Sequence, residues 1–491
     1  IGVVQCQAAL VNALIERWRP ETHSFHFSVS ECAVTLEDVA LIYGLSTNDL
    51  PVTGPTLSSY EALEAECLDQ FGVAPRQADC RGSFIKLTWF RALKDRLVLV
   101  DDIQIHRYVK CHIMLLFGTV MFGDKSGAGV HWKFLPLLRN FAGIIQFSWG
   151  SACLAHLYRA LCRATRVDCK EIDGPLTLLL AWDWIRLPFL APIPSNPRIF
   201  PIANRWHNWE RENWSYRLRK LEHLRGNLDA LQEGQPYAIG RTDLDVSPAD
   251  IRQHSAIWSA TVPLISFECI EWHASDRLRR QFGLTQGVPQ QERDLGEAHG
   301  QVLTSPKNQD WSGTHSVWVM HWMNRYSHIL VQDTVPSQHQ SDIYLHWYRR
   351  VGLMHLVDLF KYNMLDSFMN DVVGPAEPVG LAELVGPAEP VVPVEPVGLV
   401  ELVSYPEQVG PAEPINNTTS ASQTSINPVL ILIKTFQFDK PKIFMDAWSN
   451  TAMDHEINGA NNKNSVSSIE KLSLSSLDLS MGSGYMDEEV G

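Results

Sequence analysis

Apolar residues recur at helical spacing along most of the first 365 positions. Leu10, Leu14 and Trp18 lie four positions apart, which favours one face of a helix. Pro20 is expected to end this helix, because the residue before a proline disfavours the α conformation. The same periodicity predicts further helices over residues 83–97, 108–117, 151–166, 176–184, 206–231 and 317–326.

Local signals for helix starts and strands complete this pattern. Thr35 and Asp38 have the spacing of a capping box, with aspartate in place of glutamate, which predicts a helix start. Strand signals are shorter, and the best is AIWSATVPLISFECIEWH at residues 256–273. We therefore predict a mainly α fold with minor β (α+β) over residues 1–365.

The pattern changes abruptly after Asp371. Residues 373–414 consist of seven consecutive hexapeptides of the type VGPAEP, in which glutamate recurs at the fifth place. Proline at this density blocks helix and sheet interiors, so we expect an extended, acidic, low-complexity linker; a β-helix built from hexads is the alternative. Residues 415–491 are rich in Ser and Asn and poor in apolar residues, which predicts a disordered tail.

Charge is distributed unevenly between these parts. The 491-residue chain has a formal net charge of -14; residues 371–491 contain 17 acidic and 5 basic residues, a net charge of -12, which leaves -2 for residues 1–370. This near neutrality excludes a global basic field, so any nucleic-acid contact must be local. With 45% hydrophobic residues and 16 tryptophans, the chain can supply a large core.

Cysteine usage and hydropathy indicate the compartment. The nine cysteines include no CxxC pair, which argues against a disulfide framework and favours a reducing environment. No secretory leader precedes Val3, and the aliphatic run at residues 429–433 is far shorter than the roughly 20 residues of a membrane-spanning helix. We expect a cytosolic or nuclear protein without a membrane partner. Because the chain begins at Ile1 rather than Met, we expect its natural N-terminus to be missing.

Two segments resemble known binding motifs but fail at a key position. Gly118 and Gly123 have the spacing of a phosphate-binding loop, but Asp124 stands where the lysine should be and would repel the phosphates. Residues 35–46 echo the first helix of a helix-turn-helix, yet Pro51 interrupts the place of the recognition helix. Neither nucleotide binding nor DNA reading by these elements is expected.

One group of cysteine and histidine residues is a candidate metal site. Cys153 and His156 are three positions apart, and Cys162 and Cys169 follow. Their spacing matches no usual zinc module, and such side chains also serve in helix packing. We therefore expect no metal and no cofactor.

Residues 204–225 interleave aromatic and basic side chains. Rings beside cations can stack on single strands, so this segment is the best nucleic-acid candidate, although packing or a protein contact is the favoured interpretation. The candidate binding surface consists of Trp206, Trp209, Arg211, Trp214, Arg217, Arg219 and Lys220.

Motifs of the common catalytic classes are missing from the sequence. There is no GxSxG elbow, no HExxH helix and no lysine in a setting typical of a Schiff base. Adjacent acids such as Asp101 and Asp102 are common in solvated turns. We expect neither enzymatic activity nor a small-molecule substrate. The alternative is a transposable-element-encoded enzyme or accessory factor acting on DNA, which would require three carboxylates to converge in one pocket.

Six ordered blocks of the chain resemble the plant mobile domain, also called aminotransferase-like, of the MAIN-like (maintenance of meristems) family. They begin with LVNALIERWRPETHSFHF and TLEDVALIYGLSTNDLPVTG, end with NRWHNW, and cover roughly residues 1–360. The most recognisable block contains Trp18, Arg19, Pro20, Glu21, Thr22, His23 and Phe25. We interpret this block as structural, with Trp18 in a core, Pro20 ending a helix and Glu21 or Thr22 bonding backbone groups; a binding surface is the alternative.

The resemblance implies a nuclear protein associated with meristem maintenance, genome stability and the silencing of repeats and transposons. It implies nuclear protein partners that are phosphatase-like or chromatin-associated, with nucleic acid as a further candidate, and it brings no catalytic residues. Pyridoxal-phosphate chemistry is not expected, since no lysine site supports it. In the tail, FMDAWSN resembles the C-terminal region of plant growth-regulating transcription factors, which suggests a captured fragment of a host gene; a misjoined gene model is the alternative.

Overall fold

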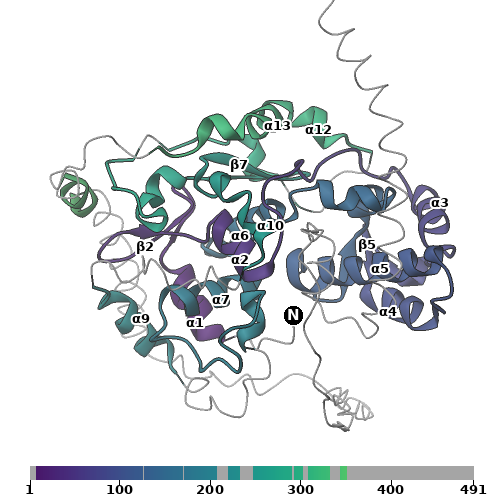
Figure 1. The fold of residues 1–491 in the computed structure, drawn as a ribbon, viewed down its shortest axis with the longest axis horizontal. Helices are drawn as coiled ribbons and strands as arrows, with labels where there is room; N and C mark the ends of the chain where they lie inside the picture. The colour runs from purple at the N-terminus through teal and green to yellow at the C-terminus, as the bar shows by residue number, and fades with distance from the viewer. Residues whose placement is uncertain are drawn as a thin grey trace, which may run out of the picture. The chain divides into compact units, whose positions relative to one another are not determined.

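The computed structural model describes residues 7–124, 126–169, 171–206, 219–232, 247–289, 292–301, 303, 308–331 and 343–350. These residues form helices packed around small antiparallel sheets (Figure 1), which confirms the predicted mainly α fold with a minor β part. The predicted linker (373–414) and tail (415–491) lie outside the described residues.

Helices account for most of the described chain. The α-helices are α1 (Ala8–Ile15), α2 (Leu36–Tyr43), α3 (Tyr60–Phe71), α4 (Leu87–Arg96), α5 (Asp102–Leu116), α6 (Trp149–Ala164), α7 (Leu176–Arg186), α9 (Leu221–Asp229), α10 (Ala249–Arg252), α11 (Glu297–Gly300), α12 (Trp311–Thr314) and α13 (Ser316–Met323). A π-helical turn (Phe117–Met121) follows α5, and short 3-10 segments occur at Gln77–Asp79, Trp132–Leu138, Ala142–Gln146, Ile202–Trp206, Ser255–Ser259, Ser275–Phe282 and Arg325–His328.

The strands are short and pair antiparallel in three sheets. The first sheet contains β1 (Trp18–Arg19), β2 (Ser24–His26) and β3 (Glu31–Cys32) in that order. The second contains β4 (Cys80–Arg81), β5 (Phe84–Lys86) and β6 (Gly129–His131). The third is the hairpin of β7 (Val262–Ser266) and β8 (Cys269–His273), which confirms the strand structure predicted within residues 256–273.

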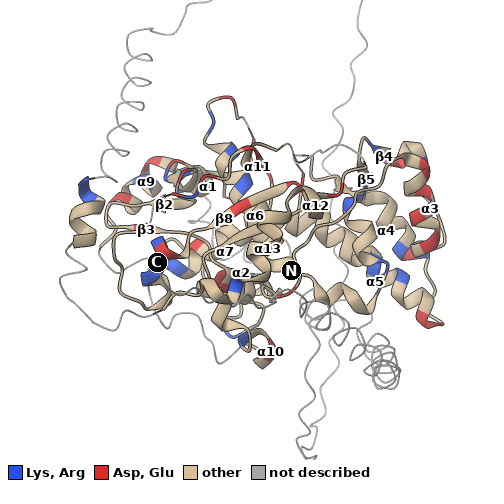
Figure 2. Ribbon diagram, turned by 90° about the horizontal axis from the view of Figure 1, so that it is seen from above, with Lys and Arg blue, Asp and Glu red and all other residues tan. Residues whose placement is uncertain are grey.

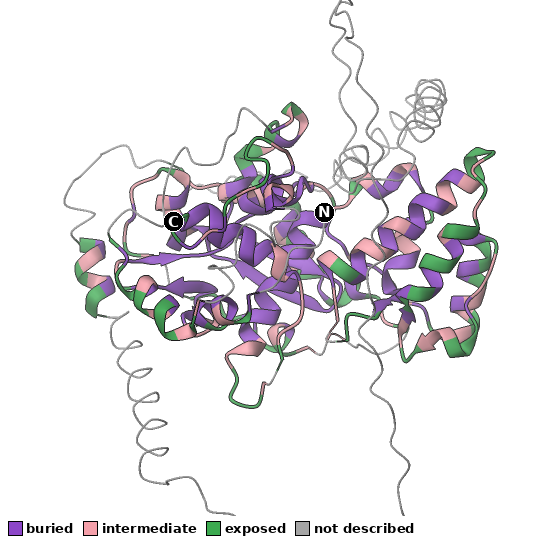
Figure 3. Ribbon diagram, turned by 90° about the horizontal axis from the view of Figure 1, so that it is seen from below, coloured by how far each residue is buried: buried purple, intermediate pink, exposed green. Residues whose placement is uncertain are grey.

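Helix α6 is the central element of the core. Its sequence WGSACLAHLYRALCRA is apolar or small on almost every face, and such a helix is stable only when other elements surround it. Residues 149–162 of α6 are buried, and the helix packs against α2 and the β7–β8 hairpin. Figure 3 shows the buried residues gathered in the inner elements of the fold. Gly150 is required at its start, because an added Cβ would lie 2.7 Å from the carbonyl oxygen of Ser46.

Helix α2 begins as its sequence predicts. The Thr35 hydroxyl accepts a hydrogen bond from the Asp38 backbone N–H, and the Asp38 carboxylate accepts one from the Thr35 backbone N–H, which confirms the capping box. The helix ends at Gly44, whose φ of 67° lies in the left-handed region that favours glycine.

Helices α3, α4 and α5 pack beside the second sheet (Figure 1). Two predicted boundaries here need correction. The helix predicted over residues 83–97 begins only at Leu87, because Phe84–Lys86 pairs with Gly129–His131 as β5 and β6. The helix predicted to begin at residue 108 begins at Asp102, where the Asp101 side chain accepts a hydrogen bond from the Gln104 backbone N–H. In Figure 2, acidic side chains gather on α3, whose sequence YEALEAECLDQF contains no lysine or arginine.

Within the described residues, none of the helices is both long and apolar enough to cross a bilayer. The described cysteines are all free thiols.

Candidate functional site

The most recognisable sequence block forms the turn between β1 and β2. Trp18 lies opposite Phe25 in an antiparallel pair. The expectation that Trp18 continues the first helix is wrong, because α1 ends at Ile15 and Trp18 begins a strand. Pro20 lies in the following turn rather than at a helix end. Strand pairing prevails here because it buries two aromatic rings against the core.

Trp18 is buried in the core, as predicted. Its ring centroid lies 4.9 Å from that of Phe25 and 5.0 Å from that of Tyr158. The indole Nε1–H donates to Sγ of Cys162 over 3.2 Å. Thr22 bonds a backbone group, also as predicted, because its hydroxyl donates to the Arg19 carbonyl oxygen over 3.4 Å.

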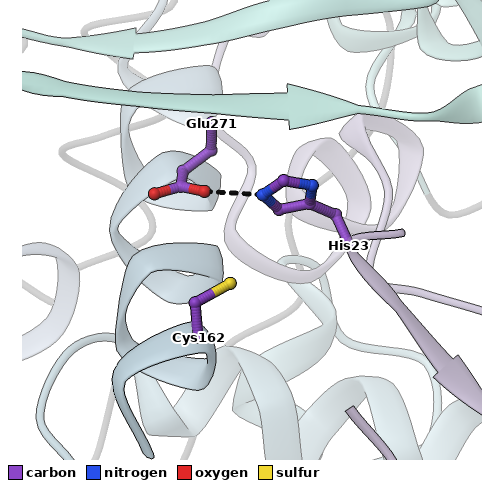
Figure 4. A group of neighbouring side chains, drawn as sticks. All are labelled: His23, Cys162 and Glu271. Atoms are coloured by element: carbon purple, nitrogen blue, oxygen red, sulfur yellow. Dashed lines mark hydrogen bonds and ion pairs between the residues drawn. The ribbon is translucent and has the colours of Figure 1, made fainter. Parts of the chain in front are cut away.

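His23 connects this turn to the centre of the molecule. Its φ of 51° lies in the left-handed region, which is unusual for a residue other than glycine. Such a conformation persists only where contacts with the surrounding structure hold it in place. Its Nε2 lies 2.7 Å from Oε2 of Glu271 on β8. Its ring stacks on Tyr158 of α6 with a centroid distance of 5.7 Å. The strained backbone thus places an imidazole against a buried carboxylate (Figure 4).

Glu271 is the centre of a buried network of charged and polar groups. Its Oε1 contacts the Arg159 guanidinium, and its Oε2 also lies 3.0 Å from Nδ1 of His299 on α11. Arg159 donates further hydrogen bonds to the carbonyl oxygens of Ile270 and Ala298. Burial opposes ionisation of Glu271, but Arg159 and the hydrogen bonds from the two histidines outweigh it and hold the pKa of Glu271 well below its ordinary value.

A pocket opens on the outer side of His23. It has a volume of about 120 Å³, and Thr22 and His23 of the turn form part of its wall. The His23 Nδ1 has no hydrogen-bond partner among the described residues and lies on the ring edge away from Glu271 (Figure 4). The full lining consists of Glu21, Thr22, His23, Thr261, Trp272, Ala274, Asp276, Arg277, Glu292 and Arg293.

The pocket contains three carboxylates, which the DNA-enzyme alternative requires, but they are not arranged as metal ligands. Arg277 donates to Glu292 over 3.3 Å and to both oxygens of Glu31 over 3.2 Å. In the described part of the chain, Glu21, Asp276 and Glu292 do not form a group close enough to share an ion. The arrangement therefore gives no support to a carboxylate-bound metal for phosphoryl transfer.

The aromatic and basic segment is only partly described. Trp209, Arg211, Trp214 and Arg217 lie outside the described residues, so their assignment to a binding surface stays a prediction.

The described members of that segment have different surroundings. Trp206 is buried, packs against Trp184 with a centroid distance of 5.0 Å and donates to the Pro192 carbonyl oxygen, so its ring belongs to the core and not to a surface. Arg219 donates to the carbonyl oxygen of Leu190 over 2.9 Å, and Lys220 is exposed.

The resemblances to nucleotide- and DNA-binding motifs are not matched by structure. Gly118 lies in a π-helical turn that continues α5, whereas a phosphate-binding loop follows a strand. After α2, the next described helix is α3, which begins at Tyr60, too late for a recognition helix.

The candidate metal ligands of the sequence, Cys153, His156, Cys162 and Cys169, do not form a group close enough to share an ion among the described residues. The His156 Nε2 bonds Oγ of Ser266 over 3.0 Å, and Cys169 lies near the Glu171 carbonyl oxygen. Among the described residues, the one group with ligand atoms close enough for an ion is His23, Cys162 and Glu271.

Sequence reasoning missed Arg159, Glu271 and His299. A signal was present for two of them: Arg159 interrupts the largely apolar helix α6 (WGSACLAHLYRALCRA), and Glu271 interrupts the largely apolar strand β8 (CIEWH). Charged residues in elements of this kind are almost always paired when buried. Periodicity does not reveal which partner each one takes.

The chain is similar to one protein family model and to several plant proteins. A family model described as the plant mobile domain matches residues 1–349. The chain is 34% identical over 376 residues to the Arabidopsis thaliana serine/threonine-protein phosphatase 7 long form homolog, covering 72% of this chain and 27% of that protein. It is 31% identical over 358 residues to the Arabidopsis thaliana protein MAIN-LIKE 2, covering 71% and 52%.

A third relative is matched over most of its length. The chain is 26% identical over 359 residues to the Arabidopsis thaliana protein MAINTENANCE OF MERISTEMS, covering 72% of each. No solved structure matches the chain. The chain thus spans about a quarter of the length of the phosphatase 7 long form homolog and about half of the length of MAIN-LIKE 2. With the family model matched across nearly all of the described fold, the chain belongs to the plant mobile domain family.

Proposed function

We propose that this chain is a non-enzymatic nuclear protein that acts in the maintenance of plant meristems, and in the associated silencing of repeats, by binding a protein partner. The observation that carries the meristem role is the match to MAINTENANCE OF MERISTEMS, which extends over 72% of that protein. The MAIN-LIKE 1 protein of the same plant supports it, with 30% identity over 383 residues and 71% of its length covered.

An exposed apolar face on α13 supports binding to a protein. Trp322 fastens the helix to the core, since it is buried and its Nε1–H donates to the Asp49 carbonyl oxygen over 2.9 Å. Val317 and Met320, one helical turn apart, are 72% and 60% exposed, and Met323 continues the row. Apolar side chains gathered in this way are typical of interaction surfaces.

The charges around this face indicate the chemistry of the partner. Residues 311–331 contain no acidic side chain. Arg293 lies 5.6 Å from the ring centroid of Trp318, and Arg325 lies 5.2 Å from that of Tyr326. A protein segment with apolar side chains flanked by carboxylates complements such a surface, and we propose this segment as its occupant.

The proposal is tested in a plant line that lacks MAINTENANCE OF MERISTEMS. The full chain, fused to a fluorescent protein, is expected to enter the nucleus and to restore meristem growth. The Met320→Asp variant is expected to accumulate to the same level but to restore little growth, because a carboxylate in the apolar row repels an acidic partner. Val167→Asp is the matched control, since Val167 is 87% exposed and lies away from α13 in the sequence.

The meristem role and the α13 face each have their own contrary result. Wild-type chain that stays outside the nucleus, or that leaves the meristem defect unchanged, would contradict the meristem role. Rescue by Met320→Asp equal to that by Val167→Asp would instead contradict the α13 face as the partner site while leaving the meristem role intact.

A further inference from the structure

We propose that His23, Cys162 and Glu271 bind a zinc ion, with His299 as the fourth ligand. This proposal does not depend on the proposed partner-binding face on α13. The site joins four segments that are far apart in the sequence: the turn between β1 and β2, the last part of α6, strand β8 and helix α11.

The donor atoms already point toward a common centre. The His23 Nε2, the Cys162 Sγ and a carboxylate oxygen of Glu271 all lie within 4.8 Å of one another. Figure 4 shows the thiol directed toward the space below the hydrogen bond between Glu271 and His23. In a tetrahedral zinc site with Zn–N and Zn–O bonds of about 2.0–2.2 Å, neighbouring donors lie about 3.3 Å apart. Side-chain rotations of about 1 Å therefore convert the present group into a coordination shell.

His299 lies outside the group whose donor atoms are all within 4.8 Å of one another, and it would complete the set of ligands by moving toward the other donors. Its Nδ1 lies 3.0 Å from the same Oε2 atom that accepts from His23, and the two imidazole centroids are 5.5 Å apart. One thiolate, two imidazoles and one carboxylate are ligands that zinc takes in proteins. With four protein ligands the site is closed, which is typical of a structural rather than a catalytic zinc.

The surrounding groups contact the ligands in a way that would support a bound ion. Arg159 contacts Oε1 of Glu271 and leaves Oε2 to the ion. The Trp18 Nε1–H donates to Sγ of Cys162 over 3.2 Å, a hydrogen bond that favours a metal-bound thiolate. The left-handed backbone conformation of His23 directs its imidazole toward Glu271.

Charge and proton balance are satisfied when the ion binds. The Cys162 thiol releases one proton to solvent and its sulfur forms the Zn–S bond. His23 moves its proton from Nε2 to Nδ1, which borders the pocket, and binds through Nε2. His299 binds through Nδ1 with its proton on Nε2. The thiolate and the Glu271 carboxylate then neutralise the two positive charges of zinc, while Arg159 keeps its contact with the carboxylate.

The experiment measures metal in the purified full chain. Wild-type protein, equilibrated with zinc and desalted, is expected to retain about one zinc per chain by plasma mass spectrometry. Removal of the ion with a chelator is expected to lower the melting temperature, because a ligand that binds only the folded state stabilises it. Cobalt in place of zinc is expected to give the near-ultraviolet charge-transfer band of a cobalt–thiolate bond.

A matched pair of variants identifies the sulfur. Cys162→Ser is expected to bind zinc at least about tenfold more weakly and to lose the cobalt–thiolate band. Cys153→Ser is the control, because Cys153 is equally buried on the same helix but lies outside the cluster. Circular dichroism establishes that both variants fold.

Two results would overturn the proposal. One is Cys162→Ser that retains the zinc content and cobalt band of Cys153→Ser. The other needs no variant: wild-type chain that retains far less than one zinc, and whose melting temperature is the same with zinc and with chelator. The cluster would then be a hydrogen-bonded network that needs no ion.

Discussion

Asp183 on α7 is a carboxylic acid whose burial disfavours its charged form. It is fully buried, and neither carboxylate oxygen has a hydrogen-bond partner among the described residues. Burial raises the pKa of Asp183 well above its ordinary value, and Arg219 opposes this only in part. Folding therefore favours the neutral acid at a pH where the unfolded chain is already ionised.

The Asp183→Asn variant should show a different dependence of stability on pH. From about pH 4 up to the raised native pKa, the folded wild type keeps a proton that the unfolded chain has released, so stability falls by up to about 1.4 kcal/mol per pH unit. The asparagine variant has no such proton to lose, so its free energy of unfolding relative to that of wild type rises with pH. Urea unfolding at several pH values measures the difference. The control is Asp95→Asn, whose side chain is 68% exposed; equal slopes in wild type and Asp183→Asn would contradict the assignment.

At the scale of elements, one carboxylate both starts a helix and joins it to another. The Asp38 Oδ2 accepts from the Thr35 backbone N–H over 2.9 Å and from its hydroxyl over 2.8 Å. The Asp38 Oδ1 accepts from the Arg186 guanidinium of α7 over 2.6 Å. Both Asp38 and Arg186 are buried, so the cap of α2 is also the polar contact between α2 and α7.

We expect Asp38→Ala and Thr35→Ala to differ sharply. Asp38→Ala should lower the free energy of unfolding by about 3–5 kcal/mol, because Arg186 is left buried without its carboxylate. Thr35→Ala should cost about 1 kcal/mol, because only one capping hydroxyl is lost. Denaturant unfolding compares the two, and the double variant Asp38→Ala with Arg186→Met should recover part of the larger loss. Equal losses in the two single variants would refute the double role of Asp38.

At the scale of the whole molecule, the distribution of charge limits the partners. Residues 1–370 carry a net charge of only -2, and residues 371–491 carry -12. The described part of the aromatic and basic segment directs Arg219 to backbone carbonyl oxygens and buries Trp206. A binding role for this segment in nucleic-acid recognition would therefore depend on residues 207–218, which lie outside the described fold.

We expect the full chain to show no salt-sensitive binding to single- or double-stranded DNA or RNA. The physical reason is that a nearly neutral domain and an acidic tail release few counterions from a phosphate backbone. Fluorescence anisotropy across a salt series measures this. Binding at low salt that disappears in the Arg211, Arg217, Arg219 and Lys220 to alanine variant would contradict the expectation and assign the segment to strand binding.

Local chemistry in the sequence was enough to determine much of the fold. The capping box at Thr35 and Asp38, a helix over residues 151–166 and strand structure within residues 256–273 were predicted, because each depends on neighbours within a few positions. The family was likewise evident from ordered blocks, each of which is a run of contiguous residues.

Only the tertiary structure decided the rest. Trp18 leaves the helical pattern for a strand because β2 offers its ring a buried partner, and the start of α4 is set by the pairing of β5 with β6. Likewise, His23, Cys162 and Glu271 meet because three distant elements pack together. Periodicity records which face of an element is apolar, whereas the identity of a contact between distant elements depends on how the whole chain packs.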